Sequence, residues 1–157
     1  LQRGEEPNLA QPLEVVSEIT LHAPALLPND YCPDVHQRLT LYKRLANCET
    51  AEDLQAVQEE LIDRFGEMPH QTQCLVETHR LRILAKPLGV AKIDAHESQI
   101  MVQFVPNPPI EPIRIIQLIQ KDRNYKLAGQ DKLAWKTYTA DVKARANAVR
   151  ALFKRLG

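Results

Sequence analysis

The sequence predicts an α+β fold, a helix-rich single domain with a few short, mostly antiparallel strands and a long C-terminal helix. Three observations predict it. Several stretches repeat apolar residues at three- and four-residue steps, which is the helical period. Two short runs of alternating, partly β-branched residues flank residues 96–98, as in a hairpin. The 157 residues are 44% hydrophobic and 25% charged, which is typical of one globular domain.

The N-terminal part shows little regular structure. Residues 1–12 are polar with two prolines, and we expect a linker or frayed end before a domain that spans residues 13–157. Since the first residue is Leu1 and not methionine, we also expect a piece of a longer protein. Residues 13–22 predict a strand, and the three prolines of residues 23–34 predict an extended connector.

Two helices follow. Asp34 is placed to cap a helix over residues 35–47. The predicted buried face of this helix consists of Val35, Leu39, Tyr42 and Leu45. Thr50 opens a T-x-x-D capping pattern for a second helix, over residues 51–65, which Gly66 ends. The predicted buried stripe of the second helix consists of Leu54, Val57, Leu61 and Phe65.

The middle of the chain predicts a third helix and then the hairpin. Residues 71–86 carry the helical pattern, and Gly89 follows its end. The predicted inward residues of this helix are Leu75, Leu81 and Leu84. Residues 90–95 and 99–105 are the expected strands of the hairpin.

The last third begins with a stiff proline-rich connector, residues 106–112, and a short apolar helix over residues 113–121. Residues 125–128 predict a further strand. We expect residues 131–156 to form one long amphipathic helix. The predicted buried side of this helix consists of Trp135, Tyr138, Val142, Val149, Leu152 and Leu156.

The sequence lacks the motifs of an enzyme. Its five glycines lie at least 23 residues apart, so no glycine-rich phosphate loop exists and we expect no ATP site in this chain. Its five histidines stand singly, and its two serines lie outside any nucleophile motif. Exposed carboxylates make poor general acids. We therefore expect a non-catalytic binding or regulatory module with no metal and no cofactor.

Cysteine use and hydropathy bear on the compartment. The three cysteines, Cys32, Cys48 and Cys74, are odd in number and widely spaced, which predicts reduced and mostly buried thiols of a cytoplasmic protein. No apolar run approaches the roughly 18 residues of a membrane span, so we expect no membrane partner. We expect the chain to be monomeric.

A net charge of zero hides a strong asymmetry. The chain has 20 basic and 20 acidic residues, which argues against a protein that coats nucleic acid or an anionic membrane. However, residues 49–67 contain seven acids and one base, whereas residues 122–157 contain nine bases and three acids. Each of these two segments is therefore a candidate interaction surface.

The acids of the second helix fall on the arc opposite its buried stripe, and we expect no base four residues on to compensate them. Two interpretations stay open. The arc is a solvated face, as charged faces usually are, or it is a docking surface for a partner that carries arginines. The candidate residues of the docking surface are Glu60 and Asp63, with Glu52, Glu59 and Arg64 as secondary candidates.

The basic C-terminal helix also has two interpretations. Its bases complement the negative end of the helix dipole, which requires no partner. Alternatively, they bind nucleic acid, although no aromatic residue is interleaved among the exposed bases for stacking. An accessory nucleic-acid-binding domain that acts through this helix is therefore the alternative function.

Several motifs of the chain resemble one bacterial family. The block E-L-I-D-R-F-G at residues 60–66, with Pro69 three residues on, is the most specific of them. The stretch L-Y-K-R-L at residues 41–45 and parts of residues 24–35 and 81–90 fit the same family. From about Glu5 to the end, the sequence resembles the C-terminal domain of the bacterial transcription-repair coupling factor.

This resemblance implies a parent that is an ATP-dependent DNA translocase, with ATP and magnesium in a motor outside this chain. The parent displaces stalled RNA polymerase and recruits the repair protein UvrA in transcription-coupled nucleotide excision repair. In the family, the C-terminal domain is a clamp that packs on an N-terminal UvrB-like module and masks its UvrA-binding surface. The family's masking contacts pair arginines with acids that match Glu60 and Asp63 here. The resemblance therefore favours the docking interpretation, with UvrA, RNA polymerase and DNA as indirect partners.

Overall fold

The computed structural model describes residues 17–157, and it confirms the α+β prediction. Its five strands are β1 (Glu18–Thr20), β2 (Val90–Ala95), β3 (Gln99–Phe104), β4 (Tyr125–Gly129) and β5 (Lys132–Lys136). Its five α-helices are α1 (Val35–Asn47), α2 (Ala51–Phe65), α3 (His70–Ala85), α4 (Pro112–Lys121) and α5 (Val142–Leu156), and a 3₁₀ turn, η3 (Lys86–Leu88), follows α3. The predicted linker 1–12 and the first residues of the predicted strand 13–22 lie outside the described residues.

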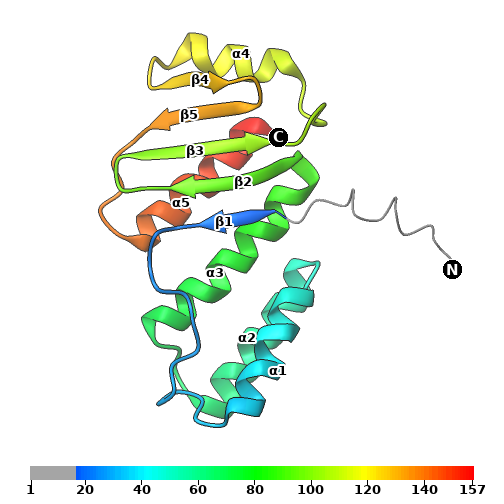
Figure 1. Ribbon diagram of the computed structural model, residues 1–157, viewed down its shortest axis with the longest axis vertical. Helices are drawn as coiled ribbons and strands as arrows, with labels where there is room; N and C mark the ends of the chain where they lie inside the picture. Colours follow the sequence, from blue (N-terminus) through cyan, green and yellow to red (C-terminus); the bar gives the residue numbers. More distant parts are fainter. Residues whose placement is uncertain (1–16) are drawn as a thin grey trace, which may run out of the picture.

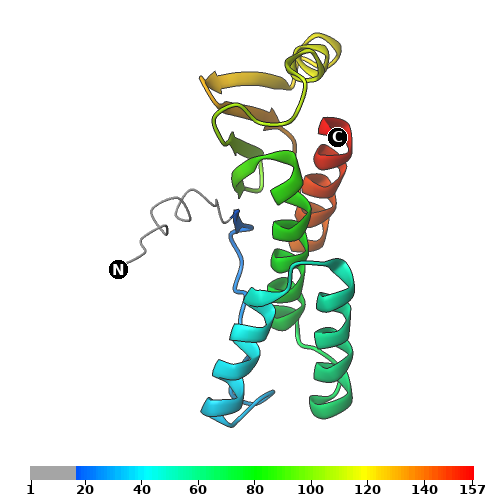
Figure 2. The ribbon, with the colours of Figure 1, turned by 90° about the vertical axis from the view of Figure 1, so that its right-hand side faces the viewer.

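The strands form one sheet in the order β1-β2-β3-β5-β4 (Figure 1). Strand β1 pairs with β2 in parallel, and the other three pairings are antiparallel. Helices α3 and α5 lie along one face of the sheet, and α4 lies beside β4 at the far edge (Figures 1 and 2). Helices α1 and α2 stand away from the sheet and pack on α3 (Figure 1).

Two hydrophobic cores share helix α3. The sheet core includes Leu81 and Ala85 of α3 together with residues of β2, β3, β5 and α5. The helical core includes Leu75 and Val76 of α3 together with residues of α1, α2 and the connector that precedes α1. Because α3 contributes to both cores, it joins the sheet half and the helical half of the molecule (Figure 2).

The helix boundaries follow the capping signals in the sequence. The Asp34 carboxylate accepts hydrogen bonds from the backbone N–H groups of His36 and Gln37 at the start of α1. The Thr50 hydroxyl accepts one from the backbone N–H of Asp53 at the start of α2, and Gly66 follows the end of α2 with φ +90°. These predicted caps are confirmed.

The proline-rich connector packs on the glycine that follows η3. Gly89 has a left-handed backbone, with φ +72°, and a Cβ at this position would lie 2.5 Å from Cδ of Pro109. The backbone N–H of Val105 also donates to the carbonyl of Gly89 at 2.8 Å. Gly89 is therefore required both for its backbone conformation and for the close approach of residues 108–109.

The prediction of one helix over residues 131–156 is wrong in its first half. Residues 132–136 form strand β5, which makes a hairpin with β4, and α5 begins only at Val142 with Asp141 as its cap. Leu133, Ala134 and Trp135 are all buried in β5, which lies between β3 and β4 in the sheet. The predicted buried Tyr138 is 71% exposed, since it lies in the loop between β5 and α5.

Three other predicted core positions are also wrong. Val35 and Leu39 are 58% and 59% exposed, and α1 instead buries Leu41 and Leu45. Leu84 of α3 is 39% exposed. Helix α1 carries apolar residues on two sides, and the positions of α2 and α3, which the sequence does not give, decide which side becomes buried.

Candidate interdomain interface

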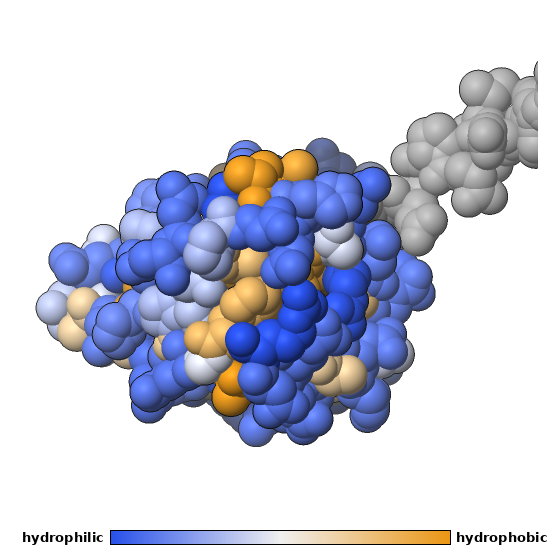
Figure 3. Space-filling model, turned by 90° about the horizontal axis from the view of Figure 1, so that it is seen from below, coloured by the Kyte–Doolittle hydropathy of each residue, from blue (hydrophilic) through white to orange (hydrophobic). Residues whose placement is uncertain are grey.

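Helix α2 presents an acidic arc to solvent. Its apolar stripe, which includes Leu54, Val57 and Leu61, is buried in the helical core, so the remaining positions face outward. The exposed acids of this arc are Glu52, Asp53, Glu59 and Asp63. Figure 3 shows the same end of the molecule from below, where hydrophilic residues predominate around a band of apolar ones. The predicted outward placement of these four acids is confirmed. Glu60, which was also expected on the arc, is only partly exposed.

Glu60 lies at the flank of the arc and is already paired. Its carboxylate accepts hydrogen bonds from the guanidinium groups of Arg44 and Arg64, each at 2.8 Å. These two hydrogen bonds lower the pKa of Glu60 to about 2, and the bond from Arg44 has the larger effect. The expectation that no acid of this helix has a base four residues on is wrong, since Arg64 stands four residues after Glu60 and binds it.

Asp63 has the opposite environment. It is exposed, and among residues 17–157 its side chain forms no ion pair or hydrogen bond. Glu52 is likewise exposed and unpaired within the described part of the chain, and Glu59 accepts one hydrogen bond, from Gln55 at 3.2 Å. The candidate residues therefore separate into an internally paired Glu60 and outward-facing acids, among them Asp63.

Arg64 is occupied on two sides. One side binds Glu60, and the guanidinium also lies over the ring of Phe65, with its carbon 5.0 Å from the ring centroid. Phe65 itself packs on the helical core and against the ring of Tyr31, whose hydroxyl donates to the backbone carbonyl of Gly66 at 2.8 Å. These contacts fix the C-terminal end of α2.

A second arginine fixes α1 relative to α3. Arg82 of α3 donates hydrogen bonds to the carbonyls of Leu45 and Cys48 at the C-terminal end of α1, at 3.2 and 2.9 Å. Its Nε also donates to Nδ1 of His79 at 3.2 Å. Burial first, and the nearby Arg82 charge second, lower the pKa of His79 to about 4. His79 is therefore a neutral acceptor, and the hydrogen bonds of Arg82 join the end of α1 to α3.

Three of the basic residues of α5 form contacts with other elements of the domain. Arg145 is 7% exposed and donates to the carbonyl of Leu21 and to the hydroxyl of Thr139. Arg150 pairs with Glu77 of α3. Arg155 lies over the rings of Trp135 and Tyr125, with its carbon 5.2 and 5.9 Å from their centroids. The geometry therefore offers little support for a nucleic-acid surface on α5.

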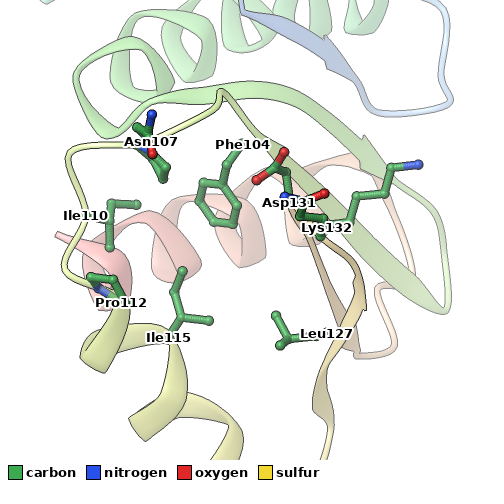
Figure 4. A pocket seen from close by; sticks show the side chains of 10 residues that line it. Phe104, Asn107, Ile110, Pro112, Ile115, Leu127, Asp131 and Lys132 are labelled. Carbon is green, nitrogen blue, oxygen red and sulfur yellow. The ribbon is translucent and has the colours of Figure 1, made fainter.

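An open pocket of about 440 Å³ lies between the proline-rich connector, α4 and the β4–β5 turn (Figure 4). Its walls include Phe104, Ile110 and Ile115, and its two charged lining residues are Asp131 and Lys132. The lining contains no nucleophile paired with a base, so this pocket has no catalytic arrangement.

One side-chain cluster was invisible in the sequence. The structure brings His22, Asp94 and His96 together, although 72 residues separate the first two. The expectation that the histidines stand singly is wrong for this pair, because β1 and β2 are neighbours in the sheet. A strand pairing between the two ends of a long segment leaves no short sequence signal.

The fold and this surface define a class of protein: a small α+β domain that presents an acidic helix face to solvent. A family model described as "TRCF domain" matches residues 21–115. The chain belongs to this family. It is 35% identical over 157 residues to the transcription-repair-coupling factor of Escherichia coli K12 and 38% identical to that of Haemophilus influenzae. Each alignment covers 99% of this chain but 14% of the relative.

A solved structure has the same fold. The crystal structure of the C-terminal domain of a transcription-repair coupling factor matches with a TM-score of 0.72 and 19% sequence identity, covering 90% of this chain and 94% of that domain. The similarity confirms the expected resemblance to the C-terminal domain. The described residues contain no helix with the length and hydropathy of a membrane span.

Proposed function

We propose that this chain is a regulatory, non-catalytic domain of a transcription-repair coupling factor, and that it masks the UvrA-binding surface of the N-terminal UvrB-like module. The observation that supports this function best is the exposed Asp63, which is unpaired within the described residues and lies on α2, a helix whose C-terminal end is held by the contacts of Arg64, Phe65 and Tyr31. An uncompensated carboxylate at such a position gains from an arginine on a partner, and a rigid support reduces the entropy lost on docking.

The proposal assigns different roles to the two main candidates. Asp63 contacts an arginine of the UvrB-like module directly, and Glu60 acts chiefly by holding Arg44 and Arg64 in place. Glu52 and Glu59 extend the acidic field along α2. Individual exposed ion pairs contribute only about 0.2–1 kcal/mol. Their sum suffices for a tethered domain, because the effective concentration within one polypeptide is high.

Under this proposal the chain itself uses no nucleotide, and ATP, magnesium, RNA polymerase and DNA interact with other parts of a cytoplasmic parent. The direct test is binding of this chain to the separately produced N-terminal module of the same parent. Asp63→Lys should weaken binding at least about tenfold, since a like charge would then face the arginines. Glu97→Lys, which changes an exposed acid in the β2–β3 turn, is the matched control and should leave binding unchanged.

Two outcomes would contradict the proposal: no binding of the unmodified chain to the module, or equal binding of both variants. A gel shift with duplex DNA at several salt concentrations tests the alternative function. Tight DNA binding that is lost when Lys143 and Lys154 of α5 are neutralised would favour an accessory nucleic-acid-binding domain.

A further inference from the structure

The parallel pairing of β1 with β2 places two histidines side by side. Thr20 of β1 is the partner of Asp94 in β2, so two residues further on His22 comes opposite His96. Both residues lie just beyond the carboxyl ends of their strands. Ligand sites commonly occupy this edge where strands run in parallel.

The side chains of these residues converge. Nε2 of His22 contacts a carboxylate oxygen of Asp94, and Nε2 of His96 lies 3.4 Å from the same oxygen. The imidazole rings are stacked, with centroids 3.9 Å apart and planes at 21°. All three potential ligand atoms lie within 4.8 Å of one another. The side chains are 40%, 35% and 51% exposed in the order His22, Asp94, His96, so an ion has access from solvent.

One buried polar pair holds the backbone beneath both histidines. Arg145 donates to the carbonyl of Leu21 at 2.6 Å and, through Nε, to the hydroxyl of Thr139 at 3.1 Å. The same hydroxyl donates to the carbonyl of His96 at 3.2 Å, and the backbone N–H of Thr139 donates to the carbonyl of Glu97 at 2.7 Å. Arg145 and Thr139 are 7% and 3% exposed.

The backbone of His22 also departs from its ordinary range. Its φ is +56°, in the left-handed region that residues other than glycine seldom occupy. Such conformations cost energy, persist only where the surroundings enforce them, and cluster at functional sites. In this conformation the carbonyl of the buried Leu21 accepts the hydrogen bond from Arg145, and the side chain of the next residue, His22, points toward Asp94.

We propose that His22, Asp94 and His96 form a surface site for a divalent transition-metal ion, with zinc as the ion it binds in solution. Two imidazoles and one carboxylate are ligands typical of zinc sites with an open fourth position. Ligand atoms on a tetrahedral zinc, with bonds of about 2.0–2.1 Å, lie about 3.3–3.4 Å apart. The separation of 3.4 Å between His96 and Asp94 agrees with this value, whereas the His22 and Asp94 atoms are in direct contact and must move apart when the ion binds. Imidazole favours zinc, nickel and copper over magnesium and calcium.

The proposed site lies between two separate segments of the chain. Bound zinc ties the start of the connector 23–34 to the β2–β3 turn, and the fourth position is open to water or to a ligand of another molecule.

The test uses this chain with zinc chloride as the probe, in isothermal titration calorimetry and in thermal unfolding. We expect one zinc ion per chain and a rise in the unfolding temperature with zinc concentration, since the ligands come together only in the folded state. His22→Asn keeps a side chain that tolerates a left-handed backbone but is too short to reach the ion. It and His96→Gln should each weaken binding at least about tenfold, because even outer-shell changes cost 10–100-fold.

His36→Gln is the matched control, because it removes an exposed histidine on α1 and should leave zinc binding unchanged. The three cysteines are buried and do not compete for the ion in the folded chain. A second readout is the shift of the His22 and His96 ring resonances in nuclear magnetic resonance spectra on addition of zinc. The proposal is overturned if folded wild-type chain binds no zinc below about millimolar concentration, or if both site variants bind it as tightly as His36→Gln does.

Discussion

Arg44 on α1 donates a hydrogen bond at 2.8 Å to the carboxylate of Glu60 on α2, and this ion pair links the two helices beside the acidic arc. Asp63, less than one helical turn further along α2, makes no such contact within the described residues. Two acids that look equivalent in the sequence therefore have different physical roles. One supports the helix pair, and the other is available to a partner.

The first prediction concerns stability. Glu60→Gln removes the charge that two arginines bind, and it should lower the free energy of unfolding by up to about 1 kcal/mol, since the pairs are partly exposed. Asp63→Asn should change it by less than about 0.5 kcal/mol, as surface substitutions usually do. Urea denaturation followed by circular dichroism measures both. Equal losses in the two variants would show that the Arg44 and Arg64 contacts contribute nothing.

The second prediction concerns the whole parent protein, and it rests on the proposed function. Asp63→Arg should raise UvrA binding by the resting parent, in the absence of DNA and polymerase, by about tenfold or more, because it weakens the closed state. Glu97→Arg is the control and should leave UvrA binding at its resting level. If the folded Asp63→Arg protein also stays at that level, Asp63 is a solvated residue and not a contact of the clamp.

The third prediction concerns pH. The pKa of His79 is about 4 in the folded chain and near 6.5 when unfolded, so between these values the unfolded state binds more protons. The free energy of unfolding should therefore fall as the pH decreases from about 6.5 to about 4, with the His79 contribution fully present above pH 6.5. His79→Gln, whose amide oxygen can still accept from Arg82, should flatten this slope.

The control for the pH prediction is His36→Gln, which should keep the slope of the wild type, since it removes an exposed histidine. Urea denaturation at half-unit pH steps gives the comparison. Between about pH 4.5 and about pH 2 a second loss follows, because Glu60 binds a proton in the unfolded state there, whereas its folded-state pKa of about 2 keeps it ionised. A slope that is the same in wild type and His79→Gln would contradict the neutral, buried state of this imidazole.

The fourth prediction compares two glycines with positive φ. Gly89→Ala adds a Cβ that would lie 2.5 Å from Pro109, whereas the corresponding Cβ at Gly66 would meet nothing within 4 Å. Both variants strain the backbone by roughly 1 kcal/mol. Gly89→Ala should lose at least about 1 kcal/mol more than Gly66→Ala, because residues 108–109 must also move. The difference between their urea midpoints measures it, and similar midpoints would contradict the tight packing of the proline-rich connector.

Local signals in the sequence predicted most of the helices well. Asp34, Thr50 and Gly66 mark the ends of helices through contacts with residues only a few positions away. Such capping can therefore be predicted without the tertiary structure. The segment after Gly129 was mistaken because Trp135, Tyr138 and Val142 repeat at helical spacing while residues 132–136 pair with β3 and β4. Long-range pairing overrode a local pattern there.

The candidate site was predictable only in part. The helical period places Glu60 and Asp63 on the outer side of α2, but it does not show that Arg44 of another helix reaches Glu60. The cluster of His22, Asp94 and His96 depends on the register of a parallel strand pair, which no short motif encodes. Contacts between elements that lie far apart in the sequence were therefore the part of the site that the sequence alone could not predict.

Helix α3 runs from the helical half of the domain into the sheet half and contributes residues to both hydrophobic cores. Leu81 and Ala85 of this helix belong to the sheet core, and Leu75 and Val76 belong to the helical core. Unwinding of α3 would therefore disrupt both cores at once, so we expect the sheet half and the helical half to unfold together.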